Sequence, residues 1–191
     1  MAVAYLFLVM PIESGKPTRF TVSDYNDFQQ HYKDESDRSA AILASSFLEN
    51  CLEQLIREKL ADHRIKDGLF RGFGPLATFS ARSDIALLLG LIPEHIYNDL
   101  KIIRKIRNEF AHTPRPLSFG EGQIKDLAAN LIPAKGIQRS DGTMRTMAGG
   151  RSQFFSAVTW ILIHIETQRE RISPLEILKL RFEEVVDEKK A

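Results

Sequence analysis

Apolar residues recur at intervals of three and four positions through much of this 191-residue chain, and the longest such pattern runs from about Ser36 to His63. Residues at that spacing share one face of an α-helix, which has 3.6 residues per turn. The apolar face consists of Ala40, Leu43, Ala44, Phe47, Leu48, Cys51, Leu52, Leu55, Ile56 and Leu60. We expect this segment to form the longest helix of the protein.

Similar patterns elsewhere predict an all-α fold, a multi-helix bundle of about six to seven helices. The clearest of them begins at Pro93, which suits the first turn of a helix, and carries apolar residues inward as far as Phe110. A stretch near 154–165 is apolar nearly all round, which is typical of a central helix. Further helices are expected at about 23–32, from Thr78 or Ser80 to Leu89, at about 118–131 and at about 173–185.

Two connections between these helices carry signals of their own. Glycines and Pro75 break the chain after the longest helix, and apolar side chains, Phe70 and Phe73 among them, are expected to anchor this loop on the core. Residues 135–151 lack periodicity and carry basic residues against Asp141 alone, which indicates a flexible basic loop. Such a loop is normally a solvated connection, and contact with a phosphate backbone is the functional alternative.

The composition is that of one soluble domain, expected over 23–191, with an apolar arm and loop over 1–22 before it. With 26 basic and 25 acidic residues the formal net charge is +1, which argues against a chain-wide surface built to neutralise many phosphates. The single cysteine, Cys51, excludes an internal disulfide and a multi-cysteine metal site, and we expect no metal or other cofactor. The apolar run from Ala2 to Met10 is too short to span a bilayer and lacks signal-peptide flanks, so we expect a cytoplasmic protein without membrane contact.

Only the segment 101–112 offers residue types suited to chemistry. Arg107 and His112 are five residues apart, about 140° around a helix, so that the long arginine side chain can reach toward the imidazole. Two prolines end the helix soon afterwards, and the C-terminal end of its dipole favours a protonated His112. A protonated histidine beside an arginine, with Asn108 next to it, could bind a phosphate. The structural alternative is that Arg107 pairs with a carboxylate such as Glu109, and that His112 only caps the helix.

This arrangement, Arg-Asn-x-x-x-His at the end of a late helix, resembles the signature of HEPN domains, several families of which are metal-independent ribonucleases. The resemblance implies that two protomers place paired Arg107 and His112 in one cleft, with RNA or a nucleotide as the ligand. His112 would act as general base or acid, Arg107 would stabilise charge on the phosphate, and Asn108 would orient one or the other. These three residues are the catalytic candidates.

A second and longer resemblance covers residues 34–125. The blocks ESDRSAAILASSFLE at 35–49, GFGPLATFSAR at 72–82 and RNEFAH at 107–112 resemble the mannitol operon repressor (MltR-like) family, in which they occur in the same order. The resemblance implies an all-helical, self-associating transcriptional regulator without an evident DNA-reading helix. We therefore expect a homodimer that acts through protein or ligand contacts.

Three functions follow, in this order of preference. In a regulator, a polar cluster is expected where helices meet, either structural or able to bind an anionic small molecule or nucleotide; it consists of Asp37, Arg38, Arg82, Arg107 and His112. The second function is a metal-independent ribonuclease. The third is a structural module in which the helix that carries Arg107, Asn108 and His112 serves dimerisation. The first two require a guanidinium and an imidazole that share a solvent-accessible crevice.

Overall fold

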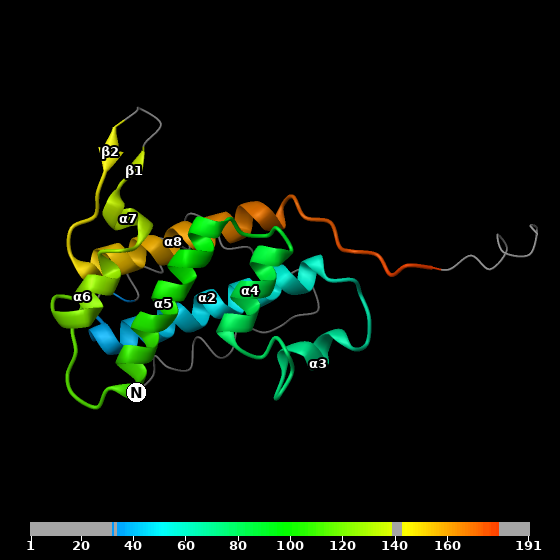
Figure 1. Ribbon diagram of the computed structural model, residues 1–191, viewed down its shortest axis with the longest axis horizontal. Helices are drawn as coiled ribbons and strands as arrows, with labels where there is room; N and C mark the ends of the chain where they lie inside the picture. Colours follow the sequence, from blue (N-terminus) through cyan, green and yellow to red (C-terminus); the bar gives the residue numbers. More distant parts are fainter. Residues whose placement is uncertain (1–31, 33, 139–142, 180–191) are drawn as a thin grey trace, which may run out of the picture.

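The computed structural model describes residues 32, 34–138 and 143–179, where the chain forms an all-α bundle with one two-residue β-ladder (Figure 1). This confirms the expected fold class. The arm over 1–22 and the helix expected near 23–32, apart from Tyr32, lie outside the described residues. The elements are α2 (Asp37–Lys59), α3 (Lys66–Phe70), α4 (Phe79–Leu88), α5 (Glu94–His112), α6 (Gly122–Ala128), α7 (Ile132–Lys135), β1 (Ile137–Gln138), β2 (Met144–Arg145) and α8 (Gly150–Arg169). Among the described helices, none combines the length and apolar character needed to cross a membrane.

The longest described helix is α2, as its periodicity predicts. Its first turn is capped by the Ser36 hydroxyl, which accepts a hydrogen bond from the Ser39 amide at 3.1 Å and so satisfies a backbone donor without a partner inside the helix. Eight residues of α2 are fully buried, because other helices cover its inner face. Leu43, which the periodicity places on the apolar face, is instead 42% exposed.

Helices α2 and α8 lie side by side and run in the same direction, α5 packs across both of them, and α4 packs against α2 and α5 (Figure 1). Ion pairs fix the relative position of α2 and α8 at both ends. Arg151 pairs with Asp37 near the two N-termini, and Arg169 pairs with Glu58 near the two C-termini. The parallel register therefore rests on charged contacts at the ends, with apolar packing between them.

Aromatic side chains fill the core where α5, α6 and α8 meet. The ring of Phe119 lies 5.0 Å from that of Phe110 and 5.1 Å from that of Phe154, and Phe155 in turn stacks on Tyr32. The first residue of α8 must be a glycine here, because a Cβ at Gly150 would lie 2.3 Å from the Phe119 carbonyl oxygen. Because Gly150 has no side chain, the N-terminus of α8 can approach the loop after α5.

The loop after α2 is packed, but only one of the two phenylalanines expected to anchor it does so. Phe70 is buried, whereas Phe73 is fully exposed, which corrects the sequence-based expectation. The turn closes so tightly that a Cβ on Gly74 would lie 2.3 Å from the Gly68 carbonyl oxygen. This close backbone contact turns the chain and leaves Phe73 directed outward.

Three further expectations need correction. The helix expected from Ser118 begins only at Gly122, because the Phe119 ring enters the core and its amide donates to Asp37 at 2.9 Å. The supposed loop 135–151 contains the β1–β2 ladder in its described part. Residues 173–179 are not helical, since the Leu175 amide donates to the Lys59 carbonyl and the chain then leaves the bundle (Figure 1). The remainder of that expected helix lies outside the described residues.

Candidate functional site

The segment that carries the candidate residues ends α5. The Thr113 amide donates to the Glu109 carbonyl, and the following proline prevents another helical turn. His112 occupies the last helical position and is exposed, whereas Arg107 and Asn108, one turn earlier, are half-buried. The Arg107 guanidinium donates to the Asn108 amide oxygen at 3.3 Å. Among the described residues, no hydrogen bond or ion pair joins Arg107 to His112.

The N-terminus of α2 holds the chain just after this helix end. The Arg38 guanidinium donates to the carbonyl of Thr113 at 2.6 Å and to that of Arg115 at 3.0 Å. Its neighbour Asp37 accepts hydrogen bonds from the Phe119 amide and from Arg151 of α8. Both residues of the predicted cluster therefore lie at the end of α5, with their polar groups already bound to protein atoms.

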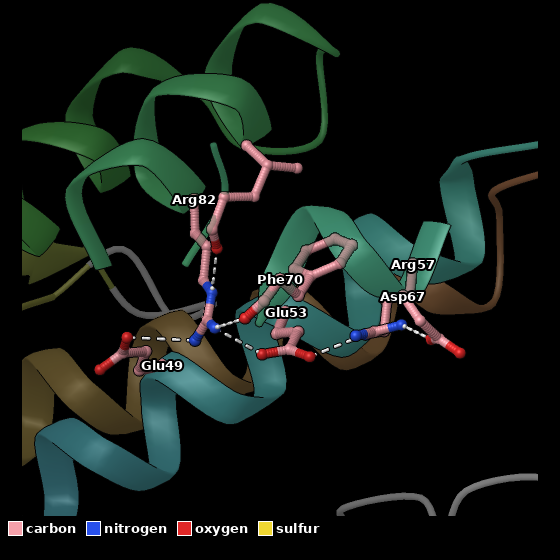
Figure 2. A network of polar contacts seen from close by, with 7 residues as sticks. Glu49, Glu53, Arg57, Asp67, Phe70 and Arg82 are labelled. Carbon is pink, nitrogen blue, oxygen red and sulfur yellow. Dashed lines mark hydrogen bonds and ion pairs between the residues drawn. The ribbon is translucent and has the colours of Figure 1, made fainter. Parts of the chain in front are cut away.

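Arg82 is buried deeper in the bundle, between α4 and α2. Its guanidinium donates to Glu49 at 3.1 Å, pairs with Glu53 at 2.7 Å, and donates to the carbonyls of Leu76 and Phe70 at 2.9 and 3.5 Å (Figure 2). Only 6% of its surface is exposed. Figure 2 shows these acceptors on all sides of the group, so Arg82 joins α4 and the loop before it to α2.

The carboxylate of Glu49 links Arg82 to α5 through electrostatics. Burial raises the pKa of Glu49, and the positive charges of Arg82 and Arg107 oppose that shift. Glu49 thus lies within the electrostatic influence of both arginines. The structure divides the predicted cluster in two: Arg82 binds Glu49, whose charge Arg107 also stabilises, while Asp37 and Arg38 lie at the end of α5 that carries His112.

The four cations of α5 lack the ion pairs that several arginines of the neighbouring helices form. Arg57, Arg82, Arg151 and Arg169 all form ion pairs. In the described part of the chain no ion pair engages the cations of α5, which are Lys101, Arg104, Lys105 and Arg107. Lys101 lies over the Tyr97 ring at 5.2 Å, a contact that leaves its charge accessible.

The sequence analysis did not identify Lys101, Arg104 and Lys105 as candidate residues. Arg104 and Lys105 follow Lys101 by three and four positions, a spacing that places all three on one side of a helix. With Asn108 and His112 they give α5 a basic outer surface that leads to the helix end. Elsewhere in the described residues, no group of three or more potential ligands is arranged to hold a metal ion. The chemistry available here is therefore the binding of negatively charged groups.

Comparison with known proteins agrees with the helical fold. The family model for MtlR, the mannitol repressor, matches residues 32–158, which is more than half of the chain. The chain belongs to the mannitol repressor family. This repressor-family chain is also similar to an X-ray structure of the MtlR–HPr complex from Escherichia coli, at 19% sequence identity and a TM-score of 0.58. The similarity covers 74% of this chain and 98% of the other. No curated protein matches the sequence.

The family match begins at Tyr32 and ends within α8, so it includes every residue of the candidate site. The solved structure supports the same helical architecture, since at this identity the similarity concerns the fold. The HEPN-type motif and the paired cleft that it implies remain predictions.

Proposed function

We propose that this protein is a mannitol operon regulator of the MtlR kind that acts through contacts with another protein or an anionic ligand. The family match carries the proposal, because it spans the bundle from Tyr32 into α8. The solved structure with a similar fold is a complex with a second protein, HPr. A regulator of this kind needs an accessible surface, not a DNA-reading helix.

The C-terminal end of α5 is the surface that we propose for this contact. His112 is exposed there, and Arg107 and Asn108 are partly accessible beside it. The two carbonyls bound by Arg38 fix the backbone that follows, so these side chains project from a rigid support. Binding residues held in this way lose little conformational entropy when a partner docks.

The experiment measures binding of HPr from the same organism to the full chain by isothermal titration calorimetry. We expect the wild-type protein to bind, and His112→Ala and Arg107→Ala to weaken binding at least about tenfold, which corresponds to about 1.4 kcal/mol. Arg64→Ala is the matched control, because Arg64 is an exposed cation that immediately precedes α3, and α3 does not pack against the end of α5 (Figure 1). Wild-type affinity in both α5 variants would place the contact elsewhere, and no binding by the wild type would exclude HPr as the partner.

Repression in cells gives an independent measurement. A reporter fused to the mannitol operon promoter, in a strain that lacks the endogenous gene, should be repressed by the wild-type chain and derepressed by His112→Ala. The Arg64→Ala protein should repress normally. Equal repression by all three proteins would mean that the end of α5 is not needed for repression.

The exposure of His112 and the absence of an ion pair on Arg107 in the described structure favour a second candidate, metal-independent RNA cleavage. Two protomers would have to bring their α5 ends together, because Arg107 and His112 do not meet within one chain. The assay incubates the purified protein with RNA in EDTA at neutral pH. Cleavage that His112→Ala abolishes supports this function, and intact RNA with the wild-type protein rejects it.

A further inference from the structure

The turn between α3 and α4 presents an aromatic side chain to solvent. Phe73 lies at its tip and is fully exposed, although phenylalanine is among the residue types most often buried in proteins. A glycine stands on each side of it. Gly72 adopts a φ of +58°, which favours glycine, and a Cβ on Gly74 would collide with the backbone of α3. We call residues 71–75 the Phe73 turn.

A buried side chain fixes the base of the Phe73 turn. The Arg82 guanidinium donates to the carbonyls of Phe70 and Leu76, at 3.5 and 2.9 Å, and these two residues flank the turn (Figure 2). The Leu76 amide in turn donates to the Leu69 carbonyl at 2.8 Å. Both ends of the turn are therefore held on the bundle, and its tip is a rigid projection.

Helix α3, which leads into the turn, is fastened to α2 as well. The Arg57 guanidinium of α2 lies 4.1 Å from the centre of the Phe70 ring and pairs with Asp67 of α3 at 2.7 Å. Phe70 is buried beneath these contacts, whereas Phe73 points outward. One phenylalanine thus anchors the segment and the other is displayed by it.

The surface around Phe73 carries an excess of positive charge. Asp62 and Asp67 are each paired with a cation of the protein. Arg71, in the turn itself, and Arg64, just before α3, are both exposed, and no ion pair within the described residues engages either of them. The displayed ring is therefore accompanied by guanidinium groups that are free to bind carboxylates.

We propose that the Phe73 turn is a docking element for a second protein partner, whose surface offers an apolar pocket for the phenyl ring and carboxylates at its rim for Arg71. Aromatic side chains and arginine are enriched in protein interfaces, where a few of them fill pockets of the partner and supply most of the affinity. The fixed base of the turn lowers the entropy lost on docking. This contact goes beyond the proposed function, because it lies on a different element from the end of α5.

The composition of this surface favours a protein over a nucleic acid or a membrane. Asp62 and Asp67 are exposed beside the arginines and would repel phosphate groups. Phe73 and Ile65 are the large apolar side chains exposed on residues 61–77, and two such side chains bury too little area to hold a protein on a lipid surface. A single projecting ring suits a pocket of about its own size.

Photocrosslinking from the turn identifies the partner. The probe is benzoylphenylalanine, a photoreactive analogue of phenylalanine, placed at position 73 of the full chain in growing cells of its own organism. Irradiation should give one predominant adduct with another protein, and mass spectrometry names that protein and the crosslinked peptide. The same analogue at position 88 is the control, because Leu88 is 81% exposed at the end of α4 and should not give this adduct.

Calorimetry with the purified partner then tests the chemistry of the contact. Phe73→Ala should weaken binding at least tenfold, and Arg71→Glu should weaken it more than Arg71→Lys does. Leu88→Ala should bind like the wild type. All of these side chains are exposed, so urea unfolding should be unchanged in every variant. Replacing a carboxylate beside the crosslinked peptide of the partner by lysine should restore binding to Arg71→Glu.

Several results would overturn the proposal. They are the absence of a light-dependent adduct at position 73, an adduct with nucleic acid, lipid or this chain itself, and wild-type affinity in Phe73→Ala. The HPr titration separates this proposal from the proposed function, since Phe73→Ala should bind HPr normally and His112→Ala should bind the new partner normally. If HPr were itself the protein crosslinked at position 73, no second partner would be needed and the proposal would fail.

Discussion

Replacement of Arg82 by alanine should destabilise the protein by about 3 kcal/mol at neutral pH. The variant leaves Glu49 without its ion-pair partner, leaves Glu53 with Arg57 as its remaining partner, and leaves two backbone carbonyls without the Arg82 donor. Removing one partner of a buried ion pair costs about 3–5 kcal/mol. We use the lower end because the side chains of Glu49 and Glu53 are 21% and 22% exposed, so water can solvate them in part.

The loss of stability in Arg82→Ala should depend on pH, and the pKa of Glu49 sets the direction of that dependence. Burial already raises the pKa of this carboxyl group, and Arg82 opposes the shift, so removal of the arginine raises it further. A carboxyl group with a raised pKa in the folded state gains stability as pH falls, because the folded protein then binds more protons than the unfolded chain. The difference between Arg82→Ala and the wild type should therefore narrow from pH 7 to pH 5.

Urea unfolding followed by circular dichroism at 222 nm measures both effects. Glu49→Gln in the Arg82→Ala background should recover part of the lost free energy, because it removes the uncompensated charge. Arg64→Ala, an exposed cation, should change stability by less than about 0.5 kcal/mol. A loss below about 1 kcal/mol for Arg82→Ala, or one that Glu49→Gln does not reduce, would refute the structural role of Arg82.

Three further substitutions test other parts of the fold. Asp99 is buried and accepts from the Ile132 amide at 3.2 Å, and burial raises its pKa to about 6. The stability of the wild type should therefore fall by about 2 kcal/mol between pH 4 and pH 7 relative to Asp99→Asn in urea titrations. A parallel pH profile for the two proteins would contradict this. Gly150→Ala should destabilise by about 2 kcal/mol or more in thermal unfolding, because the added methyl group would collide with the Phe119 carbonyl; a neutral result would mean that α8 can shift freely. Arg38→Ala should accelerate amide hydrogen exchange in residues 113–119 and leave α4 unchanged, since two carbonyls of that loop lose their donor.

Local signals determine which parts of the fold the sequence could predict. The extents of α2 and α5 follow from apolar periodicity, from a serine that caps the first helix and from prolines that flank the second. Burial of a loop residue depends instead on contacts distant in sequence. Phe70 and Phe73 have the same side chain and lie three residues apart, yet Phe70 enters the core and Phe73 is exposed beside the tight backbone turn at Gly74.

The candidate site shows the same distinction. The order of Arg107, Asn108 and His112 near the end of a helix could be read from the chain, because it is local. The acceptors of Arg82 could not, since Glu49 lies 33 positions away on another helix. The basic side of α5 could have been predicted by applying the same periodicity argument to charged residues. That Lys101, Arg104, Lys105 and Arg107 form no ion pair within the described residues could be learned only from the structure.

The distribution of ion pairs has a consequence for how this family can diversify. Charged contacts that hold α3, α4 and α8 in place converge on α2, whereas the cations of α5 take no part in them within the described chain. Under the proposed function, substitutions on the outer side of α5 alter partner recognition and leave these ion pairs unchanged. Recognition and the ion pairs that hold the bundle then depend on different helices, so that each can change in evolution while the other is preserved.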